Sequence, residues 1–168
     1  LMLSCSTKKN TAQTRRWHAF TARFNTYFNG HEAFVAGEQA KQEGHTDDFT
    51  ELLPVFYVSQ EKSRTLGKTN YETAITKCQK AIQLHSIKKR PQVSASKRQN
   101  PKTRAYLQRK EFNPFLKHAW LLMGQAQFEK GEFLEAATTF AYIARLYAAE
   151  PLVAAEARLW LARCYSQT

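Results

Sequence analysis

Hydrophobic positions recur at helical spacing along most of this 168-residue chain. In the clearest run, Trp120, Met123 and Gly124 fall at i, i+3 and i+4 and share one helix face. The same period predicts helices over residues 12–29, 31–43, 70–87, 115–129, 133–148 and 152–166. The predicted fold class is therefore all-α, built from antiparallel helix pairs without a sheet.

The region from His118 to Pro151 carries more than a helical period. Phe128 extends the first face, and Gly131 stands where a helix C-terminus favours a residue free to take positive φ. The period then restarts at Phe133, Ala136, Phe140 and Ile143. This spacing resembles the 34-residue tetratricopeptide pattern at most of its signature positions. The alternative is an unrelated helical hairpin of a bundle, which shares the period but not the whole set.

Two flanking segments resemble parts of the same repeat. Leu152–Tyr165 repeats the first-helix pattern, and a segment upstream mirrors the second helix with Tyr71, Ala74, Cys78 and Ala81. We therefore expect helix hairpins stacked as a tetratricopeptide-like α-solenoid. Such an array buries its apolar faces only against neighbouring repeats. Together with a start at Leu1, this leads us to expect an N-terminal piece of a longer protein.

The predicted organisation has six parts. They are the end of a signal peptide with a lipobox and polar tether (1–11), an aromatic helical hairpin plus loop (12–68), a repeat-like helix (69–90), a basic flexible loop (91–113), a complete tetratricopeptide repeat (114–151) and the first helix of a truncated repeat (152–168).

The N-terminal hairpin has an unusually aromatic first helix. Gly30 is expected to end that helix, and a second helix returns with Phe34 and Val35 inward. The rings are predicted to be core, the alternative being a ligand or partner groove. The aromatic residues at helical spacing are Trp17, Phe20, Phe24, Tyr27 and Phe28.

The net charge of +11 is concentrated in one segment. Residues 87–110 hold nine Lys or Arg and no acidic residue. With Pro91 and Pro101, this composition predicts the least ordered segment, a loop between two helical units that adds nothing to the core. It is either solvated without a partner or a contact for acidic protein, anionic lipid or nucleic acid. Only Tyr106 interleaves the charges, so no nucleic-acid partner is expected.

The chain shows little sign of catalysis. Its five His are dispersed, and no phosphate loop, Gly-x-Ser-x-Gly or metal-ligand spacing is present. In the acidic doublet, Asp48 is expected to cap a helix beginning near Phe49. Cys78 and Cys164 are expected to be small hydrophobes on helix faces. No enzyme activity, cofactor, metal or small-molecule substrate is predicted.

Cys5 stands at an abrupt switch from the apolar Leu1–Ser4 to a polar run. Such a switch is typical of a bacterial lipoprotein processing site. The segments CSTKKNT (5–11), HAFTARFNTYFNG (18–30), DDFTELLPVF (47–56), AIQLHSIKKRP (81–91) and EFNPFLKHAWLLMGQAQFEKGEF (111–133) resemble, in this order, the SprE/PorW family of tetratricopeptide lipoproteins. This resemblance implies an outer-membrane protein facing the periplasm, with lipid attached at Cys5.

The resemblance further implies a scaffold that makes protein–protein contacts in the type IX secretion and gliding machinery. A generic peptide-binding repeat module is the alternative. Such a module holds an acidic peptide terminus with Lys or Arg on its first helices. Lys117 and Lys130 are the basic residues there, and neither is expected on the peptide-facing part of the pattern.

Overall fold

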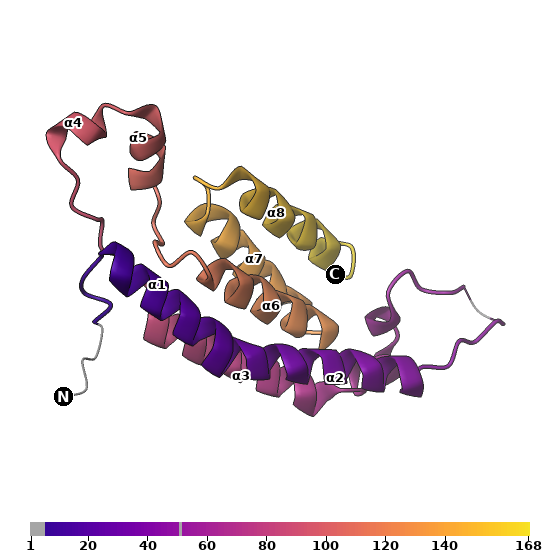
Figure 1. The fold of residues 1–168 in the computed structure, drawn as a ribbon. Coiled ribbons are helices and arrows are strands. Elements are labelled where there is room, and N and C mark those ends of the chain that lie inside the picture. Colours follow the sequence, from indigo (N-terminus) through magenta and orange to yellow (C-terminus); the bar gives the residue numbers. More distant parts are fainter. Residues whose placement is uncertain (1–5, 51) are drawn as a thin grey trace.

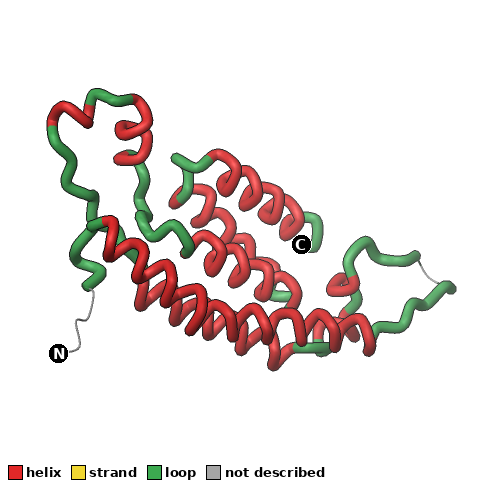
Figure 2. The backbone as a smooth tube through the Cα atoms, in the orientation of Figure 1, coloured by secondary structure: helices red, strands yellow, loops and turns green. Residues whose placement is uncertain are grey.

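The computed structural model describes residues 6–50 and 52–168. Within these ranges every regular element is helical and no strand occurs (Figure 2), so the all-α prediction is confirmed. The elements are α1 (Ala12–Thr21), the π-helical segment η1 (Ala22–Tyr27), α2 (Phe28–Gly44), the short 3-10 turns η2 (Tyr57–Ser59) and η3 (Glu61–Arg64), α3 (Lys68–His85), α4 (Ala95–Arg98), α5 (Pro101–Leu107), α6 (Leu116–Glu129), α7 (Phe133–Leu146) and α8 (Pro151–Tyr165).

The helices pack in the order in which they occur along the chain. α1, η1 and α2 form one long continuous helix, and α3 returns along it (Figure 1). α6 packs on α3, α7 on α6 and α8 on α7. The short helices α4 and α5 project from the end of the molecule where α1 begins, and the loop after α2 lies at the opposite end (Figure 1).

The predicted N-terminal hairpin is wrong, because Gly30 does not end a helix. Gly30 lies inside the long helix, where a Cβ added to it would stand 3.1 Å from Lys77 Cβ and 3.4 Å from the Ala74 carbonyl oxygen. Gly37, one heptad later, meets the Tyr71 ring in the same way, at 2.9 Å. These glycines allow α3 to approach closely. Their role is packing rather than termination.

The prediction that the N-terminal aromatic rings are core is also wrong for most of them. The small face of the long helix packs inward, with Ala22 and Thr26 buried. Only Tyr27 is half-buried, and its ring meets the edge of Phe115 at 5.0 Å. Val35, expected inward, is 46% exposed, whereas Phe34 is partly buried. The exposed rings are Trp17, Phe20, Phe24 and Phe28, at 51–62%.

Of the three hydrophobic clusters in the described core, the smallest consists of Tyr71, Ala74 and Ala126, between α3 and α6, and the two others are larger. The largest lies among α6, α7 and α8, and in it Phe128, Phe140 and Ile143 are fully buried. The second joins η1, α3 and α6 through residues such as Ala22, Cys78 and Leu116. Phe133 is buried as expected, whereas Trp120 and Trp160 are only partly buried.

The turn between α6 and α7 follows the prediction. Gly131 takes φ of 85°, in the left-handed region that residues with a Cβ rarely adopt. α1 begins with a reciprocal cap, in which Thr14 N donates to Thr11 Oγ1 and Thr11 N donates to Thr14 Oγ1. The expected helix near Phe49 is absent. Asp48 instead accepts hydrogen bonds from Thr50 N and Thr50 Oγ1, which forms a local turn.

The basic segment is an insertion between α3 and α6, as predicted, but it is partly helical because α4 and α5 lie in it. It also contributes to the core through Ile87, which is fully buried. Glu111 closes the insertion by accepting hydrogen bonds from Ile87 N, Phe112 N and Asn113 N at 2.8–3.0 Å. The predicted boundary at 113 is therefore too late, since residues 111–113 are buried.

Cys78 and Cys164 are fully buried, as expected of small apolar side chains. Burial raises the thiol pKa of Cys78 to about 12 and that of Cys164 to about 11. Both thiols therefore stay protonated near neutral pH, which removes the thiolate that a reactive cysteine needs.

Candidate functional site

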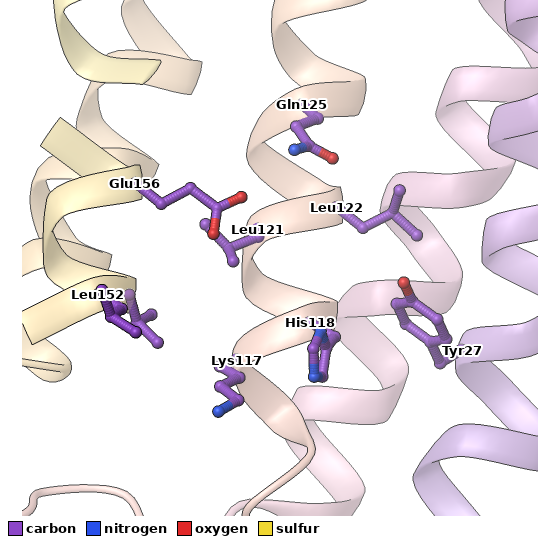
Figure 3. Close-up of a pocket in the computed structure, with 9 residues that line it drawn as sticks. Tyr27, Lys117, His118, Leu121, Leu122, Gln125, Leu152 and Glu156 are labelled. Atoms are coloured by element: carbon purple, nitrogen blue, oxygen red, sulfur yellow. The ribbon is translucent and has the colours of Figure 1, made fainter. Parts of the chain in front are cut away.

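A pocket of about 290 Å³ lies where η1, α6 and α8 come together. Figure 3 shows Leu152 and Glu156 projecting toward it from α8, with Tyr27 on the far side of α6. The side chains from α6 fall on one helix face and are Lys117, His118, Leu121, Leu122 and Gln125. Three segments far apart in sequence thus build one concave surface.

The cation of this pocket is already paired. Lys117 Nζ lies 3.6 Å from Glu150 Oε2, and Arg109 lies 3.4 Å from the other oxygen of the same carboxylate. Lys117 is one of the residues that line the pocket. Lys130 forms ion pairs with Glu72 and Glu132.

The environment of the pocket shifts the pKa of His118. Desolvation lowers its imidazole pKa, the positive charge of Lys117 acts in the same direction, and Glu156 opposes them. The ring is therefore neutral at physiological pH, with one nitrogen that donates and one that accepts. It also packs against Phe115, with ring centroids 5.1 Å apart.

The pocket offers recognition groups rather than a reacting constellation. Of the described residues, no Ser, Thr or Cys lines it. An ammonium, an imidazole, an amide and a carboxylate surround leucine side chains, a mixture that suits contact with a peptide or protein surface. Sequence reasoning missed this pocket because its walls are three separate segments. The available signal was the polar pair His118 and Gln125, seven residues apart on a largely apolar helix.

A second candidate surface is the aromatic face of the long helix. Trp17, Phe20, Phe24 and Phe28 follow one another at intervals of three or four residues and are all about half exposed. Phe20 and Phe24 pack on each other at 4.7 Å, and the Arg23 guanidinium lies 5.1 Å from the Phe24 ring centroid. Large exposed aromatic patches of this kind mark interaction surfaces in soluble domains.

Cys5 and the histidine and aspartate residues considered for chemistry are placed as follows. Cys5 lies outside the described residues. His18 and His85 come together, with Nδ1 atoms 2.9 Å apart, although no pattern in the sequence predicts that two histidines meet. His45 Nε2 donates to Asp47 Oδ1 at 2.9 Å. Nowhere in residues 6–50 and 52–168 do three His, Cys, Asp or Glu side chains gather as a metal site requires.

Comparison with known proteins leaves the family open. No protein-family model matches the chain, and no curated protein matches it significantly. In the described part of the chain, none of the helices combines the length and the apolar character needed to span a bilayer.

Proposed function

We propose that the chain is a tetratricopeptide-type scaffold of the SprE/PorW kind. In this proposal it is anchored to the outer membrane by lipid at Cys5, faces the periplasm and makes protein–protein contacts in the type IX secretion and gliding machinery. The observation that carries the proposal is the order of helix packing, in which each long helix contacts the next along the chain. Helical repeats stack in this way.

A recurring contact within the hairpins supports the repeat. A Cβ added to Gly124 in α6 would lie 2.7 Å from the Phe140 ring in α7. A Cβ added to Gly30 would lie 3.6 Å from Cys78 Sγ in α3, and Cys78 is the residue that corresponds to Phe140 in the sequence pattern. In both cases a glycine comes near the corresponding residue of the helix that follows, although Gly30 lies closest to Lys77. In this proposal the long helix is the first helix of the upstream pair.

Exposed apolar surface supports a role in protein contacts. The aromatic face lies on the first helix of the stack. At the other edge, α8 exposes Leu152, Leu159 and Tyr165 at 55–86%. Large apolar side chains on both outer helices are typical of surfaces that other elements or partners cover.

Anchoring at Cys5 is supported by the lipobox-like sequence. The number of residues between Cys5 and the first helix then limits how far the fold can lie from the anchor. α1 begins at Ala12, seven residues after Cys5. A chain of that length reaches at most about 25 Å, so the proposed anchor holds the α1 end of the molecule near the bilayer.

The anchor is tested in the full-length protein by metabolic labelling with a fatty-acid analogue. Wild type and the neighbouring control Ser6→Ala are expected to label and to fractionate with outer membrane, because both retain the thiol that is acylated. Cys5→Ala is expected to do neither. A Cys5→Ala protein that still labels would rule out acylation at this residue.

The role in secretion is tested by deleting the gene. Loss of type IX cargo from the medium and loss of gliding are expected. The point variant Phe24→Asp is expected to reduce both while the protein stays at normal abundance, whereas Thr73→Asp, on an exposed position of α3, leaves them unchanged. Normal secretion and gliding in the deletion strain would contradict this part of the proposal.

The pocket favours one alternative, a peptide-binding adaptor. Lys117, His118 and Glu156 line a concave surface of the size that holds one or two side chains. Under this alternative, His118→Ala and Glu156→Ala weaken peptide capture without changing fractionation, which separates it from the anchored scaffold.

A further inference from the structure

The two most basic parts of the chain meet at one end of the molecule. Residues 1–31 and 87–110 together hold 14 of the 25 Lys and Arg and none of the acidic residues. The structure joins them directly, because Asn10 Nδ2 donates to the Lys89 carbonyl oxygen at 2.5 Å. In addition, the Arg15 guanidinium lies 5.8 Å from the Tyr106 ring centroid. Like charges brought together in this way repel unless an anion balances them.

A cavity of about 570 Å³ lies between these two parts. Its basic side chains are Lys9, Arg15, Lys89 and Arg90, and no carboxylate lines it. Among the described residues none of these four forms an ion pair with an acid.

Two acidic residues beside the basic insertion, Glu111 and Glu150, are engaged elsewhere. Glu111 is 3% exposed, and its oxygens accept from Ser86 Oγ and from three backbone N–H groups. Glu150 is shared by Arg109 and Lys117. The positive potential of the cavity is therefore not cancelled from within the described chain.

The cavity is also organised in advance. Arg15 NH1 donates to Asn10 Oδ1 at 2.5 Å, which fixes the guanidinium at the rim. α1 begins at the same place and has no acidic residue in its first turn, so its N-terminal dipole adds to the positive field. A fixed arginine loses less conformational entropy when an anion binds, and its planar fork matches the oxygens of a phosphate.

We propose that this cavity binds a phosphate-bearing anionic group of the kind carried by phospholipid headgroups. The binding requires neither the repeat nor acylation of Cys5, so it is tested separately from the proposed function. A nucleic acid fits less well because the one aromatic ring in the cavity, Tyr106, is already flanked by Arg15, Arg109 and Phe112. No ring face is left on which a base could stack.

The test uses the 168-residue chain with Cys5→Ser, so that no acyl chain contributes to membrane binding. Flotation with vesicles of 30% phosphatidylglycerol in phosphatidylcholine is compared with flotation on pure phosphatidylcholine. Binding only to the anionic vesicles is expected, with a steep decrease between 50 and 300 mM salt, because exposed charges are screened at higher ionic strength.

Matched charge variants separate the contribution of the cavity to vesicle binding from the contribution of net charge. Arg15→Glu with Lys89→Glu is expected to lower vesicle affinity at least tenfold. Lys68→Glu with Lys80→Glu makes the same change in net charge at exposed positions of α3 and is expected to lower it less than threefold. Circular dichroism checks folding, and the pair Arg15→Gln with Lys89→Gln replaces the first variant if that variant does not fold. Equal losses in the two charge-reversal pairs would show that net charge alone drives binding and would overturn the proposal.

Soluble probes identify the source of the phosphate. Glycerol 3-phosphate or inorganic phosphate is expected to protect Lys9 and Lys89 from amine acetylation. Loss of the protection of Lys9 in the double variants at Arg15 and Lys89 supports the cavity as a phosphate site. If such protection occurs without vesicle binding, the source is a free phosphate compound rather than a headgroup. Absence of both, or tighter and cavity-dependent binding to single-stranded DNA, would overturn the proposal.

Discussion

At the scale of single residues, Lys41 is the most unusual side chain in the fold. It is 2% exposed, yet its Nζ donates to the Glu129 carbonyl oxygen at 2.5 Å and to Glu129 Oε2 at 2.8 Å. The ammonium also lies 4.8 Å from the Tyr71 ring centroid. Burial raises the pKa of Glu129 and the Lys41 charge opposes that increase. The pair ties α2 to the C-terminus of α6, where a cation is favourable.

Breaking this pair is expected to cost more than removing an ordinary lysine. Lys41→Met leaves the largely buried Glu129 carboxylate without its cation and should lower the free energy of unfolding by about 3–5 kcal/mol. Lys80→Met, on an exposed position of α3, should change it by less than about 0.5 kcal/mol. Urea denaturation of the two variants makes the comparison. Similar values for both would mean that the pair contributes no net stability.

The buried histidine pair predicts a dependence on pH. Desolvation lowers the pKa of His85, and the nearby charge of His18 lowers it further. The folded state therefore binds its proton less readily than the unfolded state, whose histidines titrate near 6.5. As pH falls below about 6.5 the unfolded state takes up more protons, so stability decreases. The melting temperature should be lower at pH 5 than at pH 7.5.

Two variants show which histidine causes the pH dependence of stability. His85→Gln removes one partner and should flatten the pH dependence, leaving the part that comes from His118, whose pKa is also lowered. His31→Gln, at a largely exposed position, should keep the full dependence. If His85→Gln and wild type lose the same amount of stability on acidification, the pair is not the source.

At the scale of elements, the glycine contacts decide how closely helices pair. Gly124→Ala places a Cβ 2.7 Å from the Phe140 ring, so the ring must move within a dense core. Overpacking of this kind costs about 1–3 kcal/mol, which exceeds the gain in helix propensity. Gly44→Ala instead meets the flexible end of Leu66 at 2.8 Å and should be close to neutral. Chemical denaturation of both variants tests whether the added Cβ lowers the free energy of unfolding at each position.

The basic insertion should be removable if the cut respects its hydrogen-bonded neck. Phe112 N donates to the Ile87 carbonyl oxygen at 2.9 Å, so the ends of the insertion already lie together. Replacing residues 88–110 by Asn-Gly should leave helicity and melting temperature nearly unchanged, since loop length changes closure entropy by only about 0.6 kcal/mol per doubling.

Replacing residues 87–110 by Ala-Asn-Gly provides the matched comparison. It differs by one side chain, Ile87, which is fully buried, and should destabilise the protein by a further ~1.5–3 kcal/mol. Equal melting temperatures for the two deletions would mean that Ile87 contributes nothing to the core.

How far the sequence predicted these elements depends on the range of the deciding contacts. The helices expected at 70–87, 115–129, 133–148 and 152–166 correspond to α3, α6, α7 and α8 within two residues, because their periodicity and turn glycines are local signals. Gly30 was misread because the contact that explains it is with Lys77, 47 residues away. The sequence around Gly30 is compatible with either role.

The same limit applies to the candidate sites. The spacing of the aromatic residues is visible in the sequence. Whether other helices cover the face that carries them depends on where α3 and α6 lie. The basic cavity joins residues near 10 with residues near 90. The charge bias of each segment is visible in the sequence, whereas their meeting is a property of the fold.

At the scale of the whole molecule, Trp120 connects the two larger hydrophobic clusters. Trp120 packs against the cluster of α6, α7 and α8 and also against the cluster of η1, α3 and α6, and its ring lies 5.0 Å from that of Tyr142. In a stacked helical protein, cooperativity depends on such contacts between layers. Trp120 is therefore expected to make the molecule unfold as one unit, although it is only partly buried.

Trp120→Ala should lower the free energy of unfolding by about 3 kcal/mol and also reduce the slope of the denaturant dependence, because the two layers then unfold separately. Trp17→Ala removes the same side chain from the long helix, where it is 51% exposed, and should cost less than about 1 kcal/mol with an unchanged slope. Urea titrations monitored by circular dichroism and by the fluorescence of the remaining tryptophans should separate in Trp120→Ala and coincide in Trp17→Ala. Coincident transitions in both variants would show that other contacts couple the layers.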